Sequence, residues 1–253
     1  MIEAIVWGLV QGFTEFLPIS SSGHLVLIPE LLGSAPPSLA ASAVLHLGTL
    51  AAVIAYYRRD LLGLLSFRRD PATRRTLILL GVGSLPAGIG FFVRGSIVTL
   101  QASTTAVSVA LIVTGLILWF SDRFPLGNRI IASLRWPDAV VIGLGQALAL
   151  IPGISRSGMT IAAGLGRSME RSEAARFSFL LGIPAIAAAG MLELVDLAGS
   201  GAGVAGSLWI GVATAAISGY AAIAILLRVF VARGMVPFAL YAVVAGIVGL
   251  VVL

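Results

Sequence analysis

Two related stretches decide the fold that the sequence predicts. Residues 11–24 read QGFTEFLPISSSGH, and residues 152–160 read PGISRSGMT. Around each, a short apolar segment is interrupted by Pro, Ser and Gly and then resumes, over residues 2–33 and 138–166. Each apolar part falls short of the roughly 20 residues that cross a bilayer. The pattern predicts two re-entrant helix–loop–helix hairpins, which are tolerated at membrane depth only where protein or a wet cavity surrounds them.

The composition places both hairpins in a membrane protein. Of the 253 residues, 58% are hydrophobic and 11% are charged, whereas a typical soluble domain is about 25% charged. We therefore predict an all-α polytopic membrane protein, a single integral membrane domain over residues 1–253 with two re-entrant hairpins and six transmembrane helices. Gly81 and Pro86 predict a kink in the second helix. The six predicted spans are 38–57, 76–93, 104–120, 177–195, 209–229 and 236–253.

The charges predict the orientation in the membrane. All sixteen basic residues are arginines, and fourteen of them fall on one side if both hairpins return to the side from which they start. By the positive-inside rule this side is cytoplasmic, which puts both termini outside the cell. The same placement accounts for the net charge of +5, so no nucleic-acid partner is predicted. The absence of cysteine and the presence of only two histidines exclude thiol chemistry, disulfides and a histidine-built metal centre.

The two hairpins are related by an internal repeat. Each half of the chain, over about 1–120 and 136–253, contains one hairpin and three predicted spans. Because three is odd, the halves insert with opposite orientations, and inverted repeats of this kind place a functional site near the midplane. A chance match between short Ser- and Gly-rich segments is the alternative. At an offset of 135 residues, identical residues align at Gln11/Gln146, Ile19/Ile154, Ser20/Ser155, Ser22/Ser157 and Gly23/Gly158.

The first loop combines groups that carry chemistry. Gln11 and Glu15 are four residues apart and share one face of a helix. Glu15 is a carboxylate in an apolar run, and an ionisable residue within the membrane indicates a functional site. Two plainer interpretations are that Glu15 only neutralises Arg156 and that the serines only bond to the preceding turn. Three hydroxyls and an imidazole follow Glu15, from Ser20, Ser21, Ser22 and His24.

The second loop has the composition of a phosphate-binding site. A guanidinium at the depth of Arg156 requires an anion, and arginine suits a bidentate grip on phosphate. A half-helix that begins near Ser157 would direct free N–H groups at that anion. Together the loops offer a carboxylate, a hydroxyl nucleophile, an imidazole and a phosphate clamp, which suffice to hydrolyse a phosphoanhydride. The substrate-binding candidates beside Arg156 are Ser155, Ser157, Gly158 and Thr160; in the first loop they are Gln11, Ser20 and Ser22.

Both motifs resemble the signature motifs of the undecaprenyl-diphosphate phosphatases, the bacitracin-resistance (BacA-type) family. Residues 47–53, 177–184 and 236–241 are similar to the family as well, so the resemblance covers the whole chain. It implies a multi-pass enzyme of the cell membrane that removes the terminal phosphate of a C55 polyprenyl diphosphate. The product is the lipid carrier used for cell-wall glycan export, and the activity confers bacitracin resistance. The resemblance also implies a divalent cation, magnesium or calcium, and a site open to the extracytoplasmic side.

The resemblance assigns roles to individual residues. Ser21 matches the serine proposed as nucleophile, His24 the motif histidine, and Arg156 the phosphate-binding arginine. Glu15 matches the second carboxylate of a Glu-x3-Glu pattern and is a candidate base or metal ligand. Gln11 occupies the first acidic position of that pattern, which removes one charge from a two-carboxylate metal site.

Two catalytic schemes fit these roles. In the first, Ser21 attacks the terminal phosphorus while His24, oriented by Glu15, takes the hydroxyl proton. In the second, His24 is the nucleophile and Glu15 is a metal ligand or base. His46 lies mid-span; we interpret it as a packed, hydrogen-bonded histidine, with a contact to the site as the alternative.

A transporter is the alternative class of function, for example a flippase for the lipid carrier that uses the same midplane site. Inverted repeats with broken helices are typical of carriers. A carrier needs Arg156 but has no use for the hydroxyl, imidazole and carboxylate of the first loop, so we favour the enzyme. A passive structural protein would leave both Arg156 and Glu15 unexplained. The sequence leaves the oligomeric state open, with a homodimer as one alternative.

Overall fold

The protein is built from α-helices joined by short turns. The computed structural model describes all residues except 38, 201–205 and 207, and no strand occurs among the described residues. The all-α fold class predicted from the sequence is confirmed. The helices are α1 (Ile2–Phe16), α2 (Ser21–Leu31), α3 (Leu39–Tyr56), α4 (Arg58–Leu64), α5 (Pro71–Ser84), α6 (Gly90–Gln101), α7 (Thr104–Ser121), α8 (Trp136–Leu148), α9 (Arg156–Gly166), α10 (Arg171–Ser200), α11 (Leu208–Arg233) and α12 (Val236–Val252), with 3-10 turns η1 (Leu65–Arg68), η2 (Leu85–Ile89) and η3 (Ile131–Ser133).

The outer helices are those of a multi-pass membrane protein. Helices α3 and α12 are shorter apolar helices that coincide with the spans predicted over 38–57 and 236–253. Large apolar side chains are exposed on the outer surface of the molecule, for example Ile217 on α11 and Val244 and Val251 on α12. Such a surface is stable in lipid and costly in water. Among the described residues, three stretches are both long and apolar enough to cross a bilayer: Thr104–Ser121 in α7, Arg171–Val195 in α10 and Leu208–Arg233 in α11.

The second predicted span is interrupted. The sequence predicts one kinked helix over 76–93, but α5 ends at Ser84, η2 follows, and α6 then continues to Gln101. Pro86 lies at the start of η2, where its missing N–H cannot continue the α-helical hydrogen-bond pattern. The kink predicted for this span is confirmed at Pro86, where it separates α5 from α6. The chain bends at Pro86, whereas α5 runs through Gly81 without a break.

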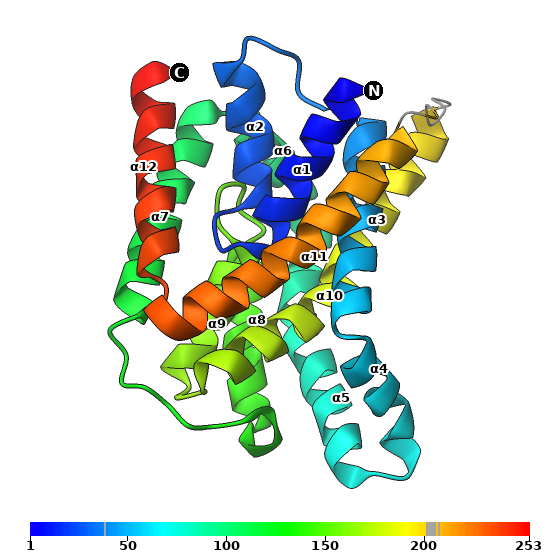
Figure 1. The fold of residues 1–253 in the computed structure, drawn as a ribbon, viewed down its shortest axis with the longest axis vertical. Helices are drawn as coiled ribbons and strands as arrows, with labels where there is room; N and C mark the ends of the chain where they lie inside the picture. Colours follow the sequence, from blue (N-terminus) through cyan, green and yellow to red (C-terminus); the bar gives the residue numbers. More distant parts are fainter. Residues whose placement is uncertain (38, 201–205, 207) are drawn as a thin grey trace.

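Two helical hairpins reach the middle of the molecule from opposite ends. Figure 1 shows the α1–α2 loop and the α8–α9 loop near the centre, and both chain termini together at one end. Helices α4 and α5, which flank an arginine-rich turn, lie at the other end (Figure 1). The hairpins expected from the two motifs are thus present. The inverted repeat that would relate them stays a prediction.

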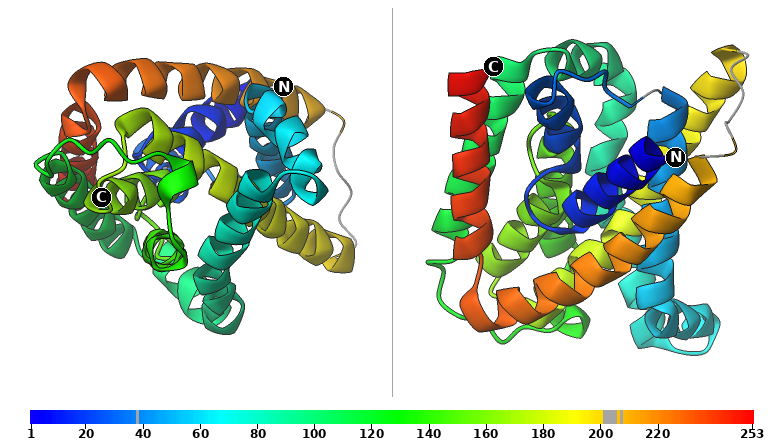
Figure 2. Two further views of the ribbon diagram at one scale, coloured as in Figure 1. Left: turned by 90° about the horizontal axis from the view of Figure 1, so that it is seen from below. Right: turned by 45° about the horizontal axis from the view of Figure 1, so that its top comes forward.

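A close helix contact holds the first hairpin in place. Helix α11 crosses one side of the molecule obliquely between α3 and α12 (Figures 1 and 2), and α1 packs against it. A Cβ at Gly8 would lie 2.6 Å from the carbonyl oxygen of Gly211, and a Cβ at Gly12 would lie 2.6 Å from that of Ala215. Only glycine permits this approach. It fixes the last turn of α1, which carries Glu15, against the long helix.

Buried ion pairs tie the loop before α8 to the second hairpin. Asp138, in the first turn of α8, is 2% exposed. Its carboxylate accepts hydrogen bonds from Arg129 Nη2 (2.7 Å), Arg167 Nε (2.6 Å) and the backbone N–H of Arg135 (2.8 Å). Because Asp138 is the common acceptor, it joins the loop, the start of α8 and the end of α9.

Asp138→Ala is expected to lower the free energy of unfolding by roughly 2–3 kcal/mol, because it removes the buried acceptor that two guanidinium groups and the backbone N–H of Arg135 share. The thermal unfolding midpoint in detergent should fall by at least about 5 °C. Glu170→Ala is the control: Glu170 is exposed and accepts a side-chain hydrogen bond from Ser172, so its removal should change stability by less than about 0.5 kcal/mol. Equal midpoints for the two variants would contradict this role of Asp138.

Candidate active site

The tips of the two hairpins contact each other. Ser20 Oγ donates to the carbonyl oxygen of Ile154 (3.4 Å), and Ser22 Oγ accepts the backbone N–H of Gly153 (3.4 Å). Each bond joins the α1–α2 loop region to the α8–α9 loop. Residues more than 130 positions apart in the chain therefore form one polar region inside the protein.

Glu15 is the centre of this region. Its Oε1 accepts a hydrogen bond from Arg156 Nη2 (2.8 Å), and its Oε2 accepts hydrogen bonds from Ser21 Oγ (2.7 Å) and Gln11 Nε2 (3.2 Å). The Glu15 and Arg156 side chains are 9% and 14% exposed, respectively. The structure thus brings together a carboxylate, a hydroxyl and a guanidinium from both hairpins in a mostly water-free setting. There, the Coulomb attraction between the charges is stronger than in water.

Two polar atoms at this centre are left for a ligand. Arg156 Nη1 and Gln11 Oε1 are buried and have no hydrogen-bond partner in the described part of the chain. Buried polar atoms are rarely left unpaired, because each costs free energy unless a partner satisfies it. Arg156 Nη1 is a donor that fits an oxygen atom of a ligand. Gln11 Oε1 is an acceptor that fits a hydrogen-bond donor or a cation.

In the second loop, an N–H group and a hydroxyl that the sequence predicts as phosphate ligands are bonded within the protein instead. Ser155 caps α9 and its Oγ accepts the Gly158 N–H (3.2 Å), so this N–H is not free for a ligand. Thr160 Oγ1 donates to the Arg156 carbonyl (2.8 Å) within α9. The Ser157 hydroxyl lies 3.3 Å from Ser155 Oγ. Arg156 is therefore the group of this loop that contacts the catalytic candidates directly.

The first loop is built on an unusual backbone conformation. Ser20 has a φ of +69° and caps α2, and its Oγ accepts the Gly23 N–H (3.3 Å). Positive φ is uncommon for a residue with a Cβ and often marks functional sites. The resulting turn directs Ser21 toward Glu15 at the start of α2.

His24 does not contact Glu15, contrary to the first catalytic scheme. Its Nδ1 lies 2.7 Å from the Ser20 carbonyl oxygen, and its Nε2 lies 2.8 Å from Tyr241 Oη on α12. The prediction that Glu15 orients His24 is wrong, because the Glu15 carboxylate is occupied by the second loop and by Ser21. The direct hydrogen bond from Ser21 to Glu15 makes the carboxylate the nearest base.

His46 is a hydrogen-bonded histidine within α3, in line with the plainer interpretation. Its Nδ1 lies 3.0 Å from the Ser42 carbonyl oxygen and 3.1 Å from Glu193 Oε2 on α10. Ser42 Oγ also donates to Glu193 (3.1 Å). The group therefore joins α3 to α10 beside the site.

Two residues that contact the site are not identified as site residues by the sequence alone. Gly182 on α10 lies against Arg156: a Cβ there would overlap the guanidinium. Tyr241 contacts His24 from α12. Both stretches are similar to the family, but neither residue is ionisable at neutral pH within an apolar run. The signal that revealed Glu15 and Arg156 is therefore absent for them.

The site offers some of the oxygen ligands that a divalent cation needs. Across the described residues, no three His, Asp or Glu side chains come together as a metal site. Gln11 nevertheless lies beside Glu15, to which its Nε2 donates (3.2 Å), and its Oε1 has no hydrogen-bond partner among the described residues. Magnesium is commonly bound through one or two carboxylates together with substrate phosphates and water. These two residues fit a cation that takes its remaining ligands from a phosphorylated substrate.

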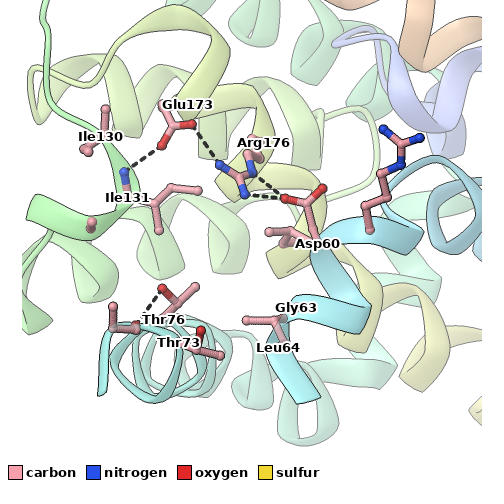
Figure 3. A pocket seen from close by; sticks show the side chains of 13 residues that line it. Asp60, Gly63, Leu64, Thr73, Thr76, Ile130, Ile131, Glu173 and Arg176 are labelled. Carbon is pink, nitrogen blue, oxygen red and sulfur yellow. Dashed lines mark hydrogen bonds and ion pairs between the residues drawn. The ribbon is translucent and has the colours of Figure 1, made fainter. Parts of the chain in front are cut away.

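A cavity of about 490 Å³ lies apart from this site, beside α4 and α5 (Figure 3). Arg176 donates to Asp60 through Nε (2.6 Å) and to Glu173 through Nη1 (3.1 Å), and Glu173 accepts the N–H of Ile131 (2.8 Å). The charges of the labelled residues thus pair with one another. Neither sequence motif contributes to the lining, so we do not consider this cavity the active site.

Comparison with known proteins agrees with the motifs. Residues 4–248 match the family model described as "Bacitracin resistance protein BacA". The chain is 44% identical to the "Undecaprenyl-diphosphatase" of Myxococcus xanthus, with 100% of this chain and 89% of the relative covered. It is 45% identical to the protein of the same name from Thermomicrobium roseum and 37% identical to that from Methanosphaera stadtmanae, each with 99% of this chain and 97% of the relative covered. The family resemblance is confirmed: the chain belongs to the bacitracin resistance protein BacA family.

Proposed function

We propose that this protein is a membrane hydrolase that converts undecaprenyl diphosphate to the monophosphate and inorganic phosphate. The proposal takes its substrate from the names of the relatives. The observation that carries it is the Glu15 carboxylate, which bridges the Ser21 hydroxyl and the Arg156 guanidinium across the two hairpins. A nucleophile, a base and an anion clamp within hydrogen-bond reach are the groups that phosphoryl transfer requires.

In the proposed reaction, Ser21 is the nucleophile and Glu15 is its base. Ser21 Oγ attacks the terminal phosphorus and its proton passes to Glu15 Oε2, which already accepts it as a hydrogen bond. The bond between that phosphorus and the bridging oxygen breaks, and undecaprenyl monophosphate leaves. Glu15 passes this proton to an oxygen of the leaving monophosphate and then takes a proton from water, which attacks the phosphoserine. As the bond between phosphorus and Ser21 Oγ breaks, Glu15 returns the proton to Oγ. This step releases inorganic phosphate and restores the hydroxyl.

Arg156 supplies the positive charge. Its unpaired Nη1 is available to a phosphate oxygen without breaking the Nη2 bond to Glu15. The planar guanidinium can bind two oxyanions through different nitrogens, so Nη1 can hold the phosphate while Nη2 holds Glu15. Arg156 therefore holds the terminal phosphate beside Ser21 and stabilises the charge that develops on it.

Glu15 and Gln11 are the residues that would hold magnesium or calcium. When bound, such a cation neutralises charge on the diphosphate oxygens. Gln11 contributes a neutral oxygen rather than a carboxylate, so the site has one negative charge fewer than a pair of acidic residues. We expect weaker cation binding for that reason.

His24 is the rival nucleophile. In this geometry its Nδ1 is held by Ser20 and its Nε2 by Tyr241, whereas Ser21 lies directly on a carboxylate. We therefore favour Ser21. A phosphorylated imidazole at His24 would reverse the assignment.

We propose further that the protein resides in the cell membrane with its termini on the extracytoplasmic side. Both termini lie at one end of the molecule and the arginine-rich segment around α4 and α5 at the other (Figure 1), as the positive-inside rule would place them. The α1–α2 hairpin then opens the site toward the outer leaflet.

The activity is tested with undecaprenyl diphosphate labelled in its terminal phosphate, incubated with purified protein and magnesium. A hydrolase yields labelled inorganic phosphate and unlabelled monophosphate in equal amounts. Intact substrate after long incubation with folded protein would contradict the proposal. A lipid-flipping assay in liposomes would then test the transporter alternative.

Gly182→Ala is expected to lower kcat/KM for phosphate release by roughly 10²-fold while the protein still folds. The added Cβ displaces the end of the flexible Arg156 side chain, and misplacing a binding group by about 1 Å costs this much. Gly81→Ala is the matched control, because a Cβ at Gly81 meets no atom within 4 Å. Equal kcat/KM for both variants would show that Gly182 does not position Arg156.

A further inference from the structure

The His24–Tyr241 contact links the candidate active site to the last helix. Tyr241 Oη lies 2.8 Å from His24 Nε2, and the two rings are stacked, with centroids 5.6 Å apart and an interplanar angle of 10°. His24 is 5% exposed, and its other nitrogen is bonded to Ser20. Both ring nitrogens are thus fixed by the protein.

These contacts define which nitrogen of His24 carries the proton. The Ser20 carbonyl oxygen can only accept, so Nδ1 must donate to it. In a neutral imidazole Nε2 is then the acceptor, and the Tyr241 hydroxyl donates to it. We propose that Tyr241 is a positioning residue of the phosphatase reaction, which donates to His24 Nε2 and thereby fixes the plane of the imidazole ring.

The position of Tyr241 supports a dedicated role. About half of its side chain is exposed, and its neighbours Leu240 and Val244 on α12 are exposed apolar residues that suit contact with lipid. A phenol hydroxyl in an apolar environment costs free energy unless it has a hydrogen-bond partner. The described structure gives that hydroxyl one partner, the histidine of the first motif. His24 is in turn bonded to the carbonyl oxygen of Ser20, the residue before Ser21, so Tyr241 acts through His24 on the turn that directs Ser21 toward Glu15.

The inference rests on the proposed phosphatase activity, but its first test does not. Nitrogen-15 NMR of the full-length protein in detergent resolves histidine tautomers, and the chain has only two histidines. A His46→Gln variant assigns the signals. We expect His24 to be the Nδ1–H tautomer in both proteins, with an Nε2 resonance that shifts in Tyr241→Phe because Nε2 loses the hydrogen bond from the hydroxyl. A wild-type Nε2–H tautomer, or the same spectrum in both proteins, would overturn the proposal.

The second test separates positioning from packing. Tyr241→Phe keeps the stacked ring and removes the hydroxyl, and we expect kcat to fall by about 10–100-fold, as for other residues that orient an active-site histidine. Tyr220→Phe is the control, because Tyr220 is also about half-exposed but contacts the Tyr56 ring at a tilt of 55°, away from the motifs.

In a His24→Asn background, Tyr241→Phe should cause no further loss. An equal loss in that background would mean that Tyr241 acts through packing and would overturn the proposal. If the wild type releases no phosphate at all, the proposed function fails, while the NMR result still stands on its own.

Discussion

Arg156→Ala is expected to lower kcat/KM for phosphate release by about 10²–10³-fold, the usual cost of removing one group that stabilises transition-state charge. Arg156 is the cation that contacts Glu15, and its free Nη1 is the donor left for a phosphate. The variant also leaves the mostly buried Glu15 without its counter-ion. Steady-state phosphate release in detergent micelles measures the effect.

Two further variants sharpen this prediction. Arg156→Lys keeps the charge but cannot hold Glu15 and the phosphate through two fixed nitrogens, so its kcat/KM should lie between those of the wild type and Arg156→Ala. Arg123→Ala is the control, because Arg123 lies over the Trp119 ring at the end of α7, away from both hairpin tips. An Arg156→Ala protein that is folded and has wild-type kcat/KM would contradict the role of a phosphate clamp.

Ser21→Ala is expected to reduce kcat by at least about 10³-fold, because it removes the nucleophile rather than one of several stabilising contacts. The Glu15–Arg156 pair should remain, so substrate binding is retained while the chemical step is lost. Ser84→Ala is the matched control: Ser84 is also a partly buried helical serine, and its hydroxyl donates to Leu80 within its own helix.

Rapid acid quenching followed by mass spectrometry identifies the phosphorylated residue. We expect phosphoserine at Ser21 in the wild type. Phosphohistidine at His24, together with substantial activity in Ser21→Ala, would overturn the assignment of the nucleophile and favour the second catalytic scheme.

Local signals predicted the hairpins well. Pro, Gly and Ser interrupt the apolar run at Pro18 and again at Pro152, and the structure has a turn near each. The break of the span over 76–93 was underestimated, because Pro86 removes one donor but the extent of a break depends on how neighbouring helices pack. The sequence cannot supply that packing.

The candidate site was predictable where burial of charge forces a partner. A lone carboxylate and a lone guanidinium in two apolar hairpins imply a pair, and Glu15 and Arg156 form one. The choice between Ser21 and His24 as the partner of Glu15 depends on side-chain directions at the first turn of α2. The contact between Tyr241 and His24 joins residues 217 positions apart and leaves no trace in local sequence.

The most direct test of the central claim is inorganic phosphate release from undecaprenyl diphosphate by the wild type, Arg156→Ala and Ser21→Ala, measured side by side with magnesium. We predict release by the wild type and its near-complete loss in both variants, because the two hairpins form one catalytic site. Folded wild-type protein that releases no phosphate, or variants that release it at the wild-type rate, would contradict the claim.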